Sequence, residues 1–299
     1  MNLGELQPGY LLDGRYRLEE PIGAGGHAYV FLAHQEGLDR KVAIKILKAT
    51  LALESDHIPA SKARTLIKRF EQEAKLISQL RDPGTITMYD YGTTDDGLLY
   101  MVVEFIEGDS LKDLQRMLGP MQPNRVAKIL EQLLYSLQEA HALGVLHRDI
   151  KPDNIMLHEH MGERDLVKLL DFGIARLFDD EGDDDVRQTR EGVLIGTPRY
   201  MAPEAIAGEA TPASDLYSFG LVVYELLTGK KAYTAKGNIE LIESQLDPNS
   251  VKLPASLLVP SNFRAIVDRM LEKDRAARWG GADEIIEALH DSGLTRASL

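Results

Sequence analysis

The pattern of hydrophobic residues changes near residues 104–108, and this change limits the folds that the chain can adopt. Before that point, short β-prone runs alternate with turn residues, as in Tyr16–Ile22, Tyr29–Ala33 and Lys41–Leu47. After it, apolar residues recur with the helical period, most clearly in Val126–Ala140. The sequence therefore predicts an α+β protein, with a small β-rich lobe followed by a larger, mainly helical lobe.

One long helix is expected within the β-rich half. Apolar residues at helical spacing run from Phe70 to Leu80, and Asp82-Pro83-Gly84 ends this helix. The remaining predicted elements follow in chain order. They are strands at Thr85–Tyr91, Leu98–Phe105, Ile155–Leu157 and Val167–Leu170, helices that stop at Gly144 and Leu227, and helices at Phe263–Met270 and Asp283–Leu289.

Composition excludes several classes of protein. The 299 residues are 44% hydrophobic and 27% charged, and the net charge of −13 argues against a nucleic-acid or membrane-surface binder. The absence of cysteine excludes disulfides, a thiolate nucleophile and Cys-ligated zinc. The chain has no apolar run long enough to span a bilayer and no signal peptide, so we expect a cytoplasmic protein without membrane contact of its own. It could still be the cytosolic part of a longer, membrane-anchored protein.

The stretch His147–Asn154 concentrates reactive groups within a short polar loop. It places a carboxylate at Asp149, an ammonium at Lys151 and an amide at Asn154. A carboxylate that accepts a proton, a lysine that neutralises phosphate and an amide that holds a metal are the groups that phosphoryl transfer from a nucleotide requires.

Three upstream features allow two interpretations each. Gly23-Ala24-Gly25-Gly26 lies between two β-prone runs, so these glycines form a hairpin that either covers phosphates or is only a tight turn. Lys45, in an apolar strand, is either solvated or bound to phosphate. Glu73, beside the apolar stripe of its helix, is either exposed or directed inward to pair with Lys45.

With Asp171-Phe172-Gly173 and Ala202-Pro203-Glu204, these motifs resemble those of eukaryotic-type (Hanks-type) serine/threonine protein kinases, bacterial branch. The bacterial character lies in Gly25-Gly26, the helix pattern from Arg69-Phe70 to Ala74, and Gly196–Glu204. The resemblance implies the two-lobed protein kinase fold. It divides the chain into a leader (1–15), a kinase domain (16–289, with N-lobe 16–104, hinge 104–108 and C-lobe 109–289) and a tail (290–299).

The resemblance also implies ATP and Mg²⁺ as cofactors, with Mn²⁺ as an alternative metal. Asp149 would accept the proton of the substrate hydroxyl, Lys151 would stabilise the γ-phosphate, and Lys45, oriented by Glu73, would hold the α- and β-phosphates. Asn154 and Asp171 would ligate the metal. The implied ATP-binding residues are Ile22, Gly23, Ala24, Gly25, Gly26, Val30, Ala43, Lys45, Val103, Glu104, Ile106 and Met156.

Specificity and regulation follow from the same resemblance. Lys151 and Thr197 are typical of serine/threonine members, and Arg148 suggests activation by autophosphorylation of the 171–204 loop. Thr189 is the first candidate phosphosite and Thr197 the second, while a solvated, unmodified Thr189 is the alternative. The loop contains an acidic run at 179–185 of undecided role. Ala28 replaces the third glycine of the phosphate-binding loop, which could restrict closure of that loop.

Three structural roles are also implied. Glu204 would pair with Arg278, and Asp215 would brace the catalytic loop. A spine of apolar side chains would include Ile77, His147 and Phe172.

The expected activity is that of a signalling phosphotransferase acting on protein serine or threonine, with a homodimer for trans-autophosphorylation as one arrangement and no nucleic-acid partner. Two rival functions are a pseudokinase scaffold and a small-molecule kinase. Retention of all the catalytic residues argues against the pseudokinase. The Ala202-Pro203-Glu204 segment, typical of protein-substrate docking, argues against the small-molecule kinase.

Overall fold

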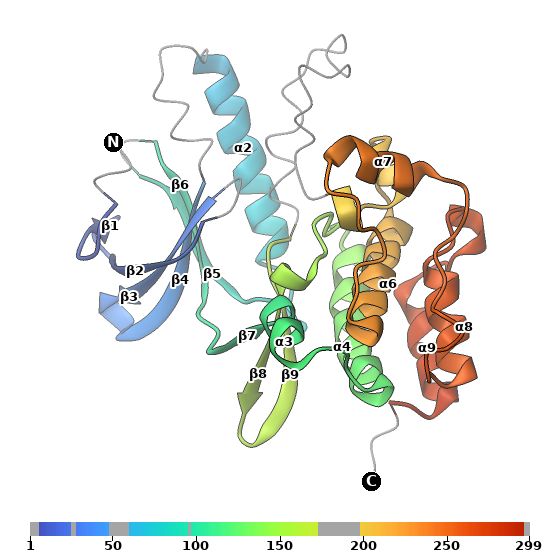
Figure 1. Cartoon of the computed structure of the whole chain (residues 1–299). Helices are drawn as coiled ribbons and strands as arrows, with labels where there is room; N and C mark the ends of the chain where they lie inside the picture. The colour runs from blue at the N-terminus through green and yellow to red at the C-terminus, as the bar shows by residue number, and fades with distance from the viewer. Residues whose placement is uncertain (1–5, 25–27, 48–59, 95–96, 173–197, 296–299) are drawn as a thin grey trace. The chain divides into compact units, whose positions relative to one another are not determined.

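The computed structural model describes residues 6–24, 28–47, 60–94, 97–172 and 198–295 (Figure 1). The chain divides into two compact units, which we describe separately. The first contains the chain up to Leu80 and Ile86–Ile106, and the second contains Arg81–Thr85 and most of the chain from Glu107 onward. The change of unit at residues 106 and 107 falls inside the segment 104–108 that the sequence indicates as a hinge.

The described residues of the first unit form a six-stranded antiparallel sheet in the order β1-β2-β3-β4-β6-β5. Its strands are β1 (Leu11–Leu12), β2 (Tyr16–Ala24), β3 (Ala28–Gln35), β4 (Arg40–Leu47), β5 (Met88–Thr93) and β6 (Leu99–Glu104). Thr85, predicted to begin a strand of this half, instead forms a parallel bridge with Leu169 of the second unit's sheet.

The core of the first unit lies on one face of this sheet, because successive side chains of a strand point to opposite faces. Val42, Ile44 and Ile46 of β4 have no solvent exposure and pack with Tyr100 and Val102 of β6. Burial of each large apolar side chain stabilises the fold by roughly 1.5–3 kcal/mol. The opposite face therefore carries the intervening residues of these strands.

The segment before residue 16 is more than the leader that the sequence indicates. Strand β1 pairs with β2, and Leu6 and Leu12 are buried in the core of the sheet. Helix α2 (Ala60–Ile77) also begins well before its apolar stripe. Phe70 attaches it to β5 through an edge-to-face contact with Tyr91, with ring centroids 6.0 Å apart.

The described part of the second unit is mainly helical, with a three-stranded antiparallel sheet, β7-β8-β9. These strands are β7 (Gly108–Ser110), β8 (Ile155–His160) and β9 (Glu163–Leu169). The helices are α3 (Leu111–Leu118), α4 (Pro123–Ala142), α5 (Pro203–Ile206), α6 (Pro212–Thr228), α7 (Asn238–Leu246), α8 (Ser261–Met270) and α9 (Ala282–Ser292). Helices α3, α5 and α7 are short and were not predicted individually.

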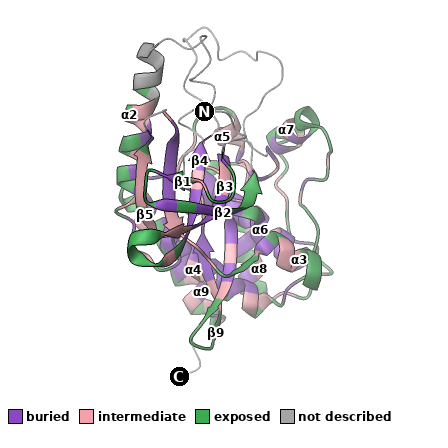
Figure 2. Cartoon of the chain, turned by 90° about the vertical axis from the view of Figure 1, so that its left-hand side faces the viewer, coloured by how far each residue is buried: buried purple, intermediate pink, exposed green. Residues whose placement is uncertain are grey.

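Helix α6 is the centre of the second unit, because it is apolar on nearly every side. Thr211 and Ser214 form a capping box at its start, and Gly229, at φ 69°, ends it. At Gly220 a Cβ would lie 3.0 Å from Met270 Cβ, so α8 packs closely there. Strand β4 of the first unit and helix α6 of the second are each largely buried (Figure 2).

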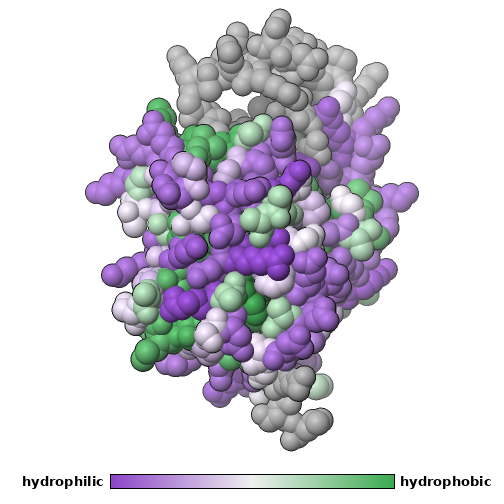
Figure 3. Space-filling view, turned by 90° about the vertical axis from the view of Figure 1, so that its right-hand side faces the viewer, coloured by the Kyte–Doolittle hydropathy of each residue, from purple (hydrophilic) through white to green (hydrophobic). Residues whose placement is uncertain are grey.

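The surface on the α8 and α9 side of the second unit is largely hydrophilic. Figure 3 shows apolar side chains there in small, separate patches among the described residues. Within the described ranges, none of the helices has the length and apolarity that a membrane span requires.

Candidate active site

The loop that follows α4 is fixed by a buried carboxylate from α6. Asp215, which is 2% exposed, accepts hydrogen bonds from the backbone N–H groups of His147 and Arg148, both at 2.9 Å. His141 Nε2 of α4 contacts the same carboxylate at 2.9 Å. The predicted bracing role of Asp215 is thereby confirmed, and main-chain amides carry it.

His147 joins this loop to the end of β9. Burial lowers the pKa of His147, so its ring is neutral. Nε2–H donates to the Leu170 carbonyl at 2.7 Å, and Nδ1 accepts from the Asp149 N–H at 3.3 Å. The ring packs against Phe172 with centroids 4.7 Å apart. These two members of the predicted spine are therefore in contact.

Asp149 is held by two side chains from its own loop. Its Oδ2 accepts from Lys151 Nζ at 2.6 Å and from Asn154 Nδ2 at 2.9 Å, and Asn154 Nδ2 also donates to the Asp149 carbonyl at 2.8 Å. The Asp149 side chain is 29% exposed. The carboxylate is therefore oriented within its loop and still accessible to a reacting molecule.

Asn154 and Asp171 both have oxygen atoms that suit a hard divalent cation. The Leu170 N–H donates to the Asn154 carbonyl at 2.8 Å, which places the residue before Asp171 beside Asn154. Because the Asn154 amide nitrogen is used by Asp149, the amide oxygen remains for another ligand. Among the described residues there is no group of three or more His, Cys, Asp or Glu that could hold a metal alone. A metal here would need oxygens from a nucleotide and water as well.

Two residues of this region have an unusual backbone conformation. Arg148 has φ 65° and Asp171 has φ 60°. Such left-handed conformations are uncommon outside glycine, and they concentrate at functional sites. Both residues had been singled out from the sequence.

In the first unit, the predicted nucleotide-binding residues share the sheet face opposite the core. Strand register places Val30 beside Lys45 and Ala43 beside Val103, and these residues alternate with the buried core positions. Gly23 pairs with Val30 at the end of β2. The structure thus brings together an ammonium, small apolar side chains and a glycine, a combination that suits a phosphate-bearing aromatic ligand.

For the other residues predicted at the nucleotide site of the first unit, the structure gives fewer contacts with this group. Within the described part of the chain, Glu73 forms no hydrogen bond or ion pair, so its predicted contact with Lys45 is absent from this structure. Glu104 uses its own N–H to bind the Thr87 carbonyl at 2.9 Å. The remaining predicted residues Ile22, Ala24 and Ile106 are described, and Met156 lies in β8 of the second unit. Gly25, Gly26, Thr189, Thr197 and the acidic run lie outside the described residues.

The predicted pair of Glu204 and Arg278 is confirmed. Arg278 donates two hydrogen bonds to the Glu204 carboxylate, at 2.6 and 2.8 Å, and its side chain has no solvent exposure. Burial alone would raise the pKa of Glu204, but hydrogen bonds from Arg278 and Ser214 outweigh burial and lower it. The pair ties α5 to the segment between α8 and α9.

Sequence reasoning missed a group of residues beside the catalytic loop. They are Lys112, Asp153, Tyr200, Glu225 and Lys231, which line one pocket with Lys151 and Pro152. The sequence feature that could have indicated this pocket was Glu225, a single charge within the otherwise apolar run Leu221–Leu227.

Comparison with known proteins yields one family across nearly the whole chain. The family model described as "protein kinase domain" matches residues 16–290. The chain is 37% identical over 274 residues to the serine/threonine-protein kinase pkn3 of Myxococcus xanthus, which covers 90% of this chain and 48% of the relative. It is 33% identical over 286 residues to PknA of Mycobacterium tuberculosis, covering 94% and 62% of the two chains. With PrkC of Bacillus subtilis the identity is 34% over 281 residues, covering 93% and 40%. The chain thus spans about half the length of these relatives.

Proposed function

Because the chain belongs to the protein kinase family, in its bacterial serine/threonine branch, we propose that it transfers the γ-phosphate of ATP to serine and threonine hydroxyls of proteins. The observation that carries this proposal is the arrangement around Asp149, whose carboxylate is oriented by Lys151 and Asn154 and remains accessible. The relatives named above are described as serine/threonine kinases, which supports the same substrate class.

In the proposed reaction, Asp149 accepts the proton of the substrate hydroxyl and aims its oxygen at the γ-phosphate. Lys151 lies 2.6 Å from Asp149 and neutralises charge on the transferred group. Lys45 holds the α- and β-phosphates, Val30, Ala43 and Met156 contact the adenine, and Val103 lies at the back of the nucleotide pocket. The Glu104 carbonyl and the Ile106 N–H bind the adenine edge. The Glu104 N–H is already bound to the Thr87 carbonyl, which leaves the Glu104 carbonyl for this role.

We propose Mg²⁺ as the metal, held by the Asn154 amide oxygen and the Asp171 carboxylate. When bound, it offsets the negative charge that develops on the phosphates. Mn²⁺, which also favours oxygen ligands, is expected to substitute. Proposed regulation is phosphorylation of Thr189 or Thr197 in the 171–204 loop, with Arg148 as the group that a loop phosphate would engage.

Glu73 is proposed to orient Lys45 in the active enzyme. Because Glu73 makes no such contact in the described part of this structure, the proposal requires a shift of α2 before catalysis. Substitution of Glu73 by glutamine is therefore expected to lower kcat more than it weakens ATP binding.

The test is incubation of the purified chain with Mg²⁺-ATP and a generic protein substrate, with phosphate mapped by mass spectrometry. Asp149→Asn should lower kcat by at least about 10²-fold, the lower bound for loss of a general base. Asp39→Asn is a matched control, since that carboxylate is 94% exposed and asparagine tolerates its left-handed backbone.

Phosphate on serine and threonine in the parent and in Asp39→Asn, and its loss in Asp149→Asn, would support the proposal. Equal labelling by all three proteins would indicate a contaminating kinase. Binding of ATP without transfer by the parent would instead indicate a nucleotide-binding scaffold.

A further inference from the structure

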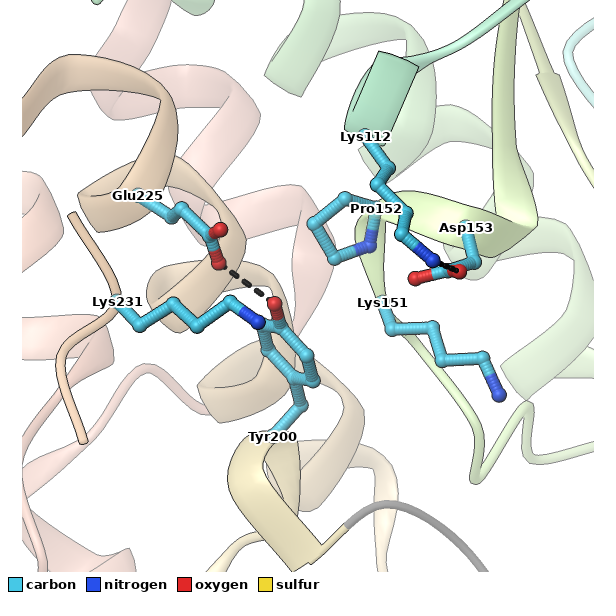
Figure 4. Close-up of a pocket in the computed structure, with 7 residues that line it drawn as sticks. All are labelled: Lys112, Lys151, Pro152, Asp153, Tyr200, Glu225 and Lys231. Atoms are coloured by element: carbon cyan, nitrogen blue, oxygen red, sulfur yellow. Dashed lines mark hydrogen bonds and ion pairs between the residues drawn. The ribbon is translucent and has the colours of Figure 1, made fainter. Parts of the chain in front are cut away.

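The short segment Pro198–Tyr200 lies next to the catalytic loop, and both belong to the second unit. Figure 4 shows Tyr200 on the other side of the pocket from Lys151 and Asp153 of that loop. Lys151 donates to Asp149 at 2.6 Å, so a protein that brings its hydroxyl to Asp149 would lie close to this segment. The position of the segment therefore affects how such a protein binds.

Helix α7 and the connection between α6 and α7 hold this segment by its main chain and by one side chain. Gln245, near the end of α7, donates from Nε2 to the carbonyls of Arg199 and Pro198, at 2.8 and 3.4 Å. The Arg199 guanidinium in turn donates to the carbonyls of Tyr233 and Ala235. The Gln245 carboxamide thus binds two consecutive carbonyls of the segment.

The Gln245 side chain is itself oriented by neighbouring groups. It has no solvent exposure, and its Oε1 accepts from the Tyr217 hydroxyl at 3.0 Å. The Tyr217 and Tyr233 hydroxyls lie 2.9 Å apart, and Lys273 Nζ donates to the backbone carbonyl of Gln245 at 2.6 Å. Because Oε1 is held by a hydroxyl donor, Nε2 is directed to the two carbonyls of the segment.

A buried network of this kind is costly to interrupt, because each polar group left without a partner keeps its full desolvation cost. Loss of the Gln245 carboxamide would remove the donor of the Arg199 carbonyl and free the segment to shift. None of the hydrogen bonds described for Gln245 involves a residue proposed to hold ATP or the metal.

We propose that Gln245 is a positioning residue for the kinase reaction, which holds Pro198–Tyr200 beside the catalytic loop and so favours binding of the protein substrate. The proposal rests on the proposed function and adds to it a residue that acts through the main chain of another segment. Loss of the carboxamide should weaken binding of the protein substrate and not of ATP. It should change kcat little, because Asp149, Lys151 and Asn154 keep their mutual contacts.

The experiment measures kcat and the separate KM values for ATP and for a generic protein substrate in Gln245→Met. Methionine keeps the length of the side chain and removes its hydrogen-bond donor. KM for the protein should rise roughly tenfold, the upper end for a lost hydrogen bond, while KM for ATP stays at the parental value.

Gln132→Met is the matched control, because the Gln132 carboxamide also binds main chain within the second unit. It donates to the Asp165 carbonyl at 3.0 Å and accepts from the Val167 N–H at 3.1 Å, so it fastens β9 and not the segment at 198–200. Both KM values should remain parental in this control, even where its thermal stability falls as far as that of Gln245→Met.

A second variant, Tyr217→Phe, leaves Gln245 in place and removes the hydroxyl that orients it. It should raise KM for the protein by roughly threefold, and by nothing further when combined with Gln245→Met, because Tyr217 acts through Gln245. Additive effects in the double variant would contradict this path. If Gln245→Met does not fold, Tyr217→Phe alone decides the outcome.

Three results would overturn the role of Gln245 and leave the kinase function intact. One is an unchanged KM for the protein in both Gln245→Met and Tyr217→Phe. The others are an equal rise of KM for ATP and for the protein, and a rise in Gln132→Met as large as that in Gln245→Met. Failure of the parent to phosphorylate any protein would remove the kinase function, and the role of Gln245 with it.

Discussion

Replacing Glu204 by glutamine removes the counter-ion of a guanidinium that has no exposure to solvent. Arg278 would retain its hydrogen bonds to the carbonyls of Glu272, Lys273 and Ala213, at 2.6, 3.0 and 3.1 Å. Its positive charge, however, would no longer be balanced by a carboxylate. A buried charge left without its partner costs far more than the loss of an exposed ion pair.

The size of the effect follows from burial. Breaking a buried pair typically costs about 3–5 kcal/mol. Glu204 is 13% exposed, so some water remains near the pair and we take the lower value, about 3 kcal/mol, for Glu204→Gln. In a domain of this size each kcal/mol lost from the free energy of unfolding lowers Tm by roughly 2–4 °C, so Glu204→Gln should lower Tm by about 6–12 °C.

The effect should depend on pH in a defined direction. The pKa of Glu204 is lowered from its ordinary value of 4.5, so the folded state holds the ionised carboxylate more strongly than the unfolded state does. This contribution is fully present above the unfolded pKa and is lost as pH falls through the folded pKa. The Tm difference between parent and Glu204→Gln should therefore be constant at neutral pH and shrink below about pH 4.5.

The assay is thermal unfolding followed by circular dichroism from neutral to acidic pH. Glu159→Gln is the matched control, because Glu159 pairs with Arg164 at 3.1 Å while the two side chains are 55% and 82% exposed. Loss of this exposed ion pair in Glu159→Gln should lower the free energy of unfolding by less than about 1 kcal/mol. The reasoning would be refuted if Glu204→Gln lowered Tm no more than Glu159→Gln does, or if its effect grew as the pH fell.

Three further substitutions test other contacts. Asp215→Ala removes the acceptor of two catalytic-loop amides, so kcat should fall about 10²-fold with little change in ATP affinity measured by calorimetry; an unchanged kcat would contradict the bracing role. Gly108→Ala places a Cβ 2.3 Å from the Leu157 carbonyl oxygen and should destabilise the chain by about 1–3 kcal/mol in urea unfolding. Ser110→Ala removes the cap that accepts from the Asp113 N–H and should cost about 1 kcal/mol in the same assay, while a cost near zero would show that water replaces the cap.

Where one periodic pattern covered a whole element, the sequence predicted the structure well. Strand β4 alternates between Val42, Ile44 and Ile46 of the core cluster and a second face that carries Ala43 and Lys45, and this period of two identifies both faces from the sequence. Helix α4 behaves similarly, since its apolar stripe and Gly144, at φ 74°, mark its course and its end.

Other elements lacked such a pattern. Strand β1 has two residues, too few for alternation, and turn signals flank it, so the segment read as a leader although Leu12 has no solvent exposure. Pro59 and polar residues before Arg69 indicate a connector and a helix start in the sequence, but they do not fix the residue at which the helix begins. Periodicity also shows which side of α2 carries Glu73, but not how far the helix lies from Lys45.

Within the candidate site, the sequence indicated residues close together in the chain better than distant partners. The contacts among Asp149, Lys151 and Asn154 lie within one loop. The ion pair between Lys112 and Asp153 joins residues 41 positions apart, and Tyr200 meets Glu225 across 25. No local pattern connects such pairs, because α3 packs against the catalytic loop at Asp153 and α6 packs against the segment at Tyr200.

The attachment of the reactive loop to Asp215 has a consequence for how proteins of this design diversify. The anchor binds main-chain amides, which every residue except proline possesses, so these two hydrogen bonds do not depend on which side chains stand at positions 147 and 148. The pocket residues Lys112 and Lys231 take no part in that anchor. Substitutions in that pocket can therefore change its lining while the loop that carries Asp149 keeps its place.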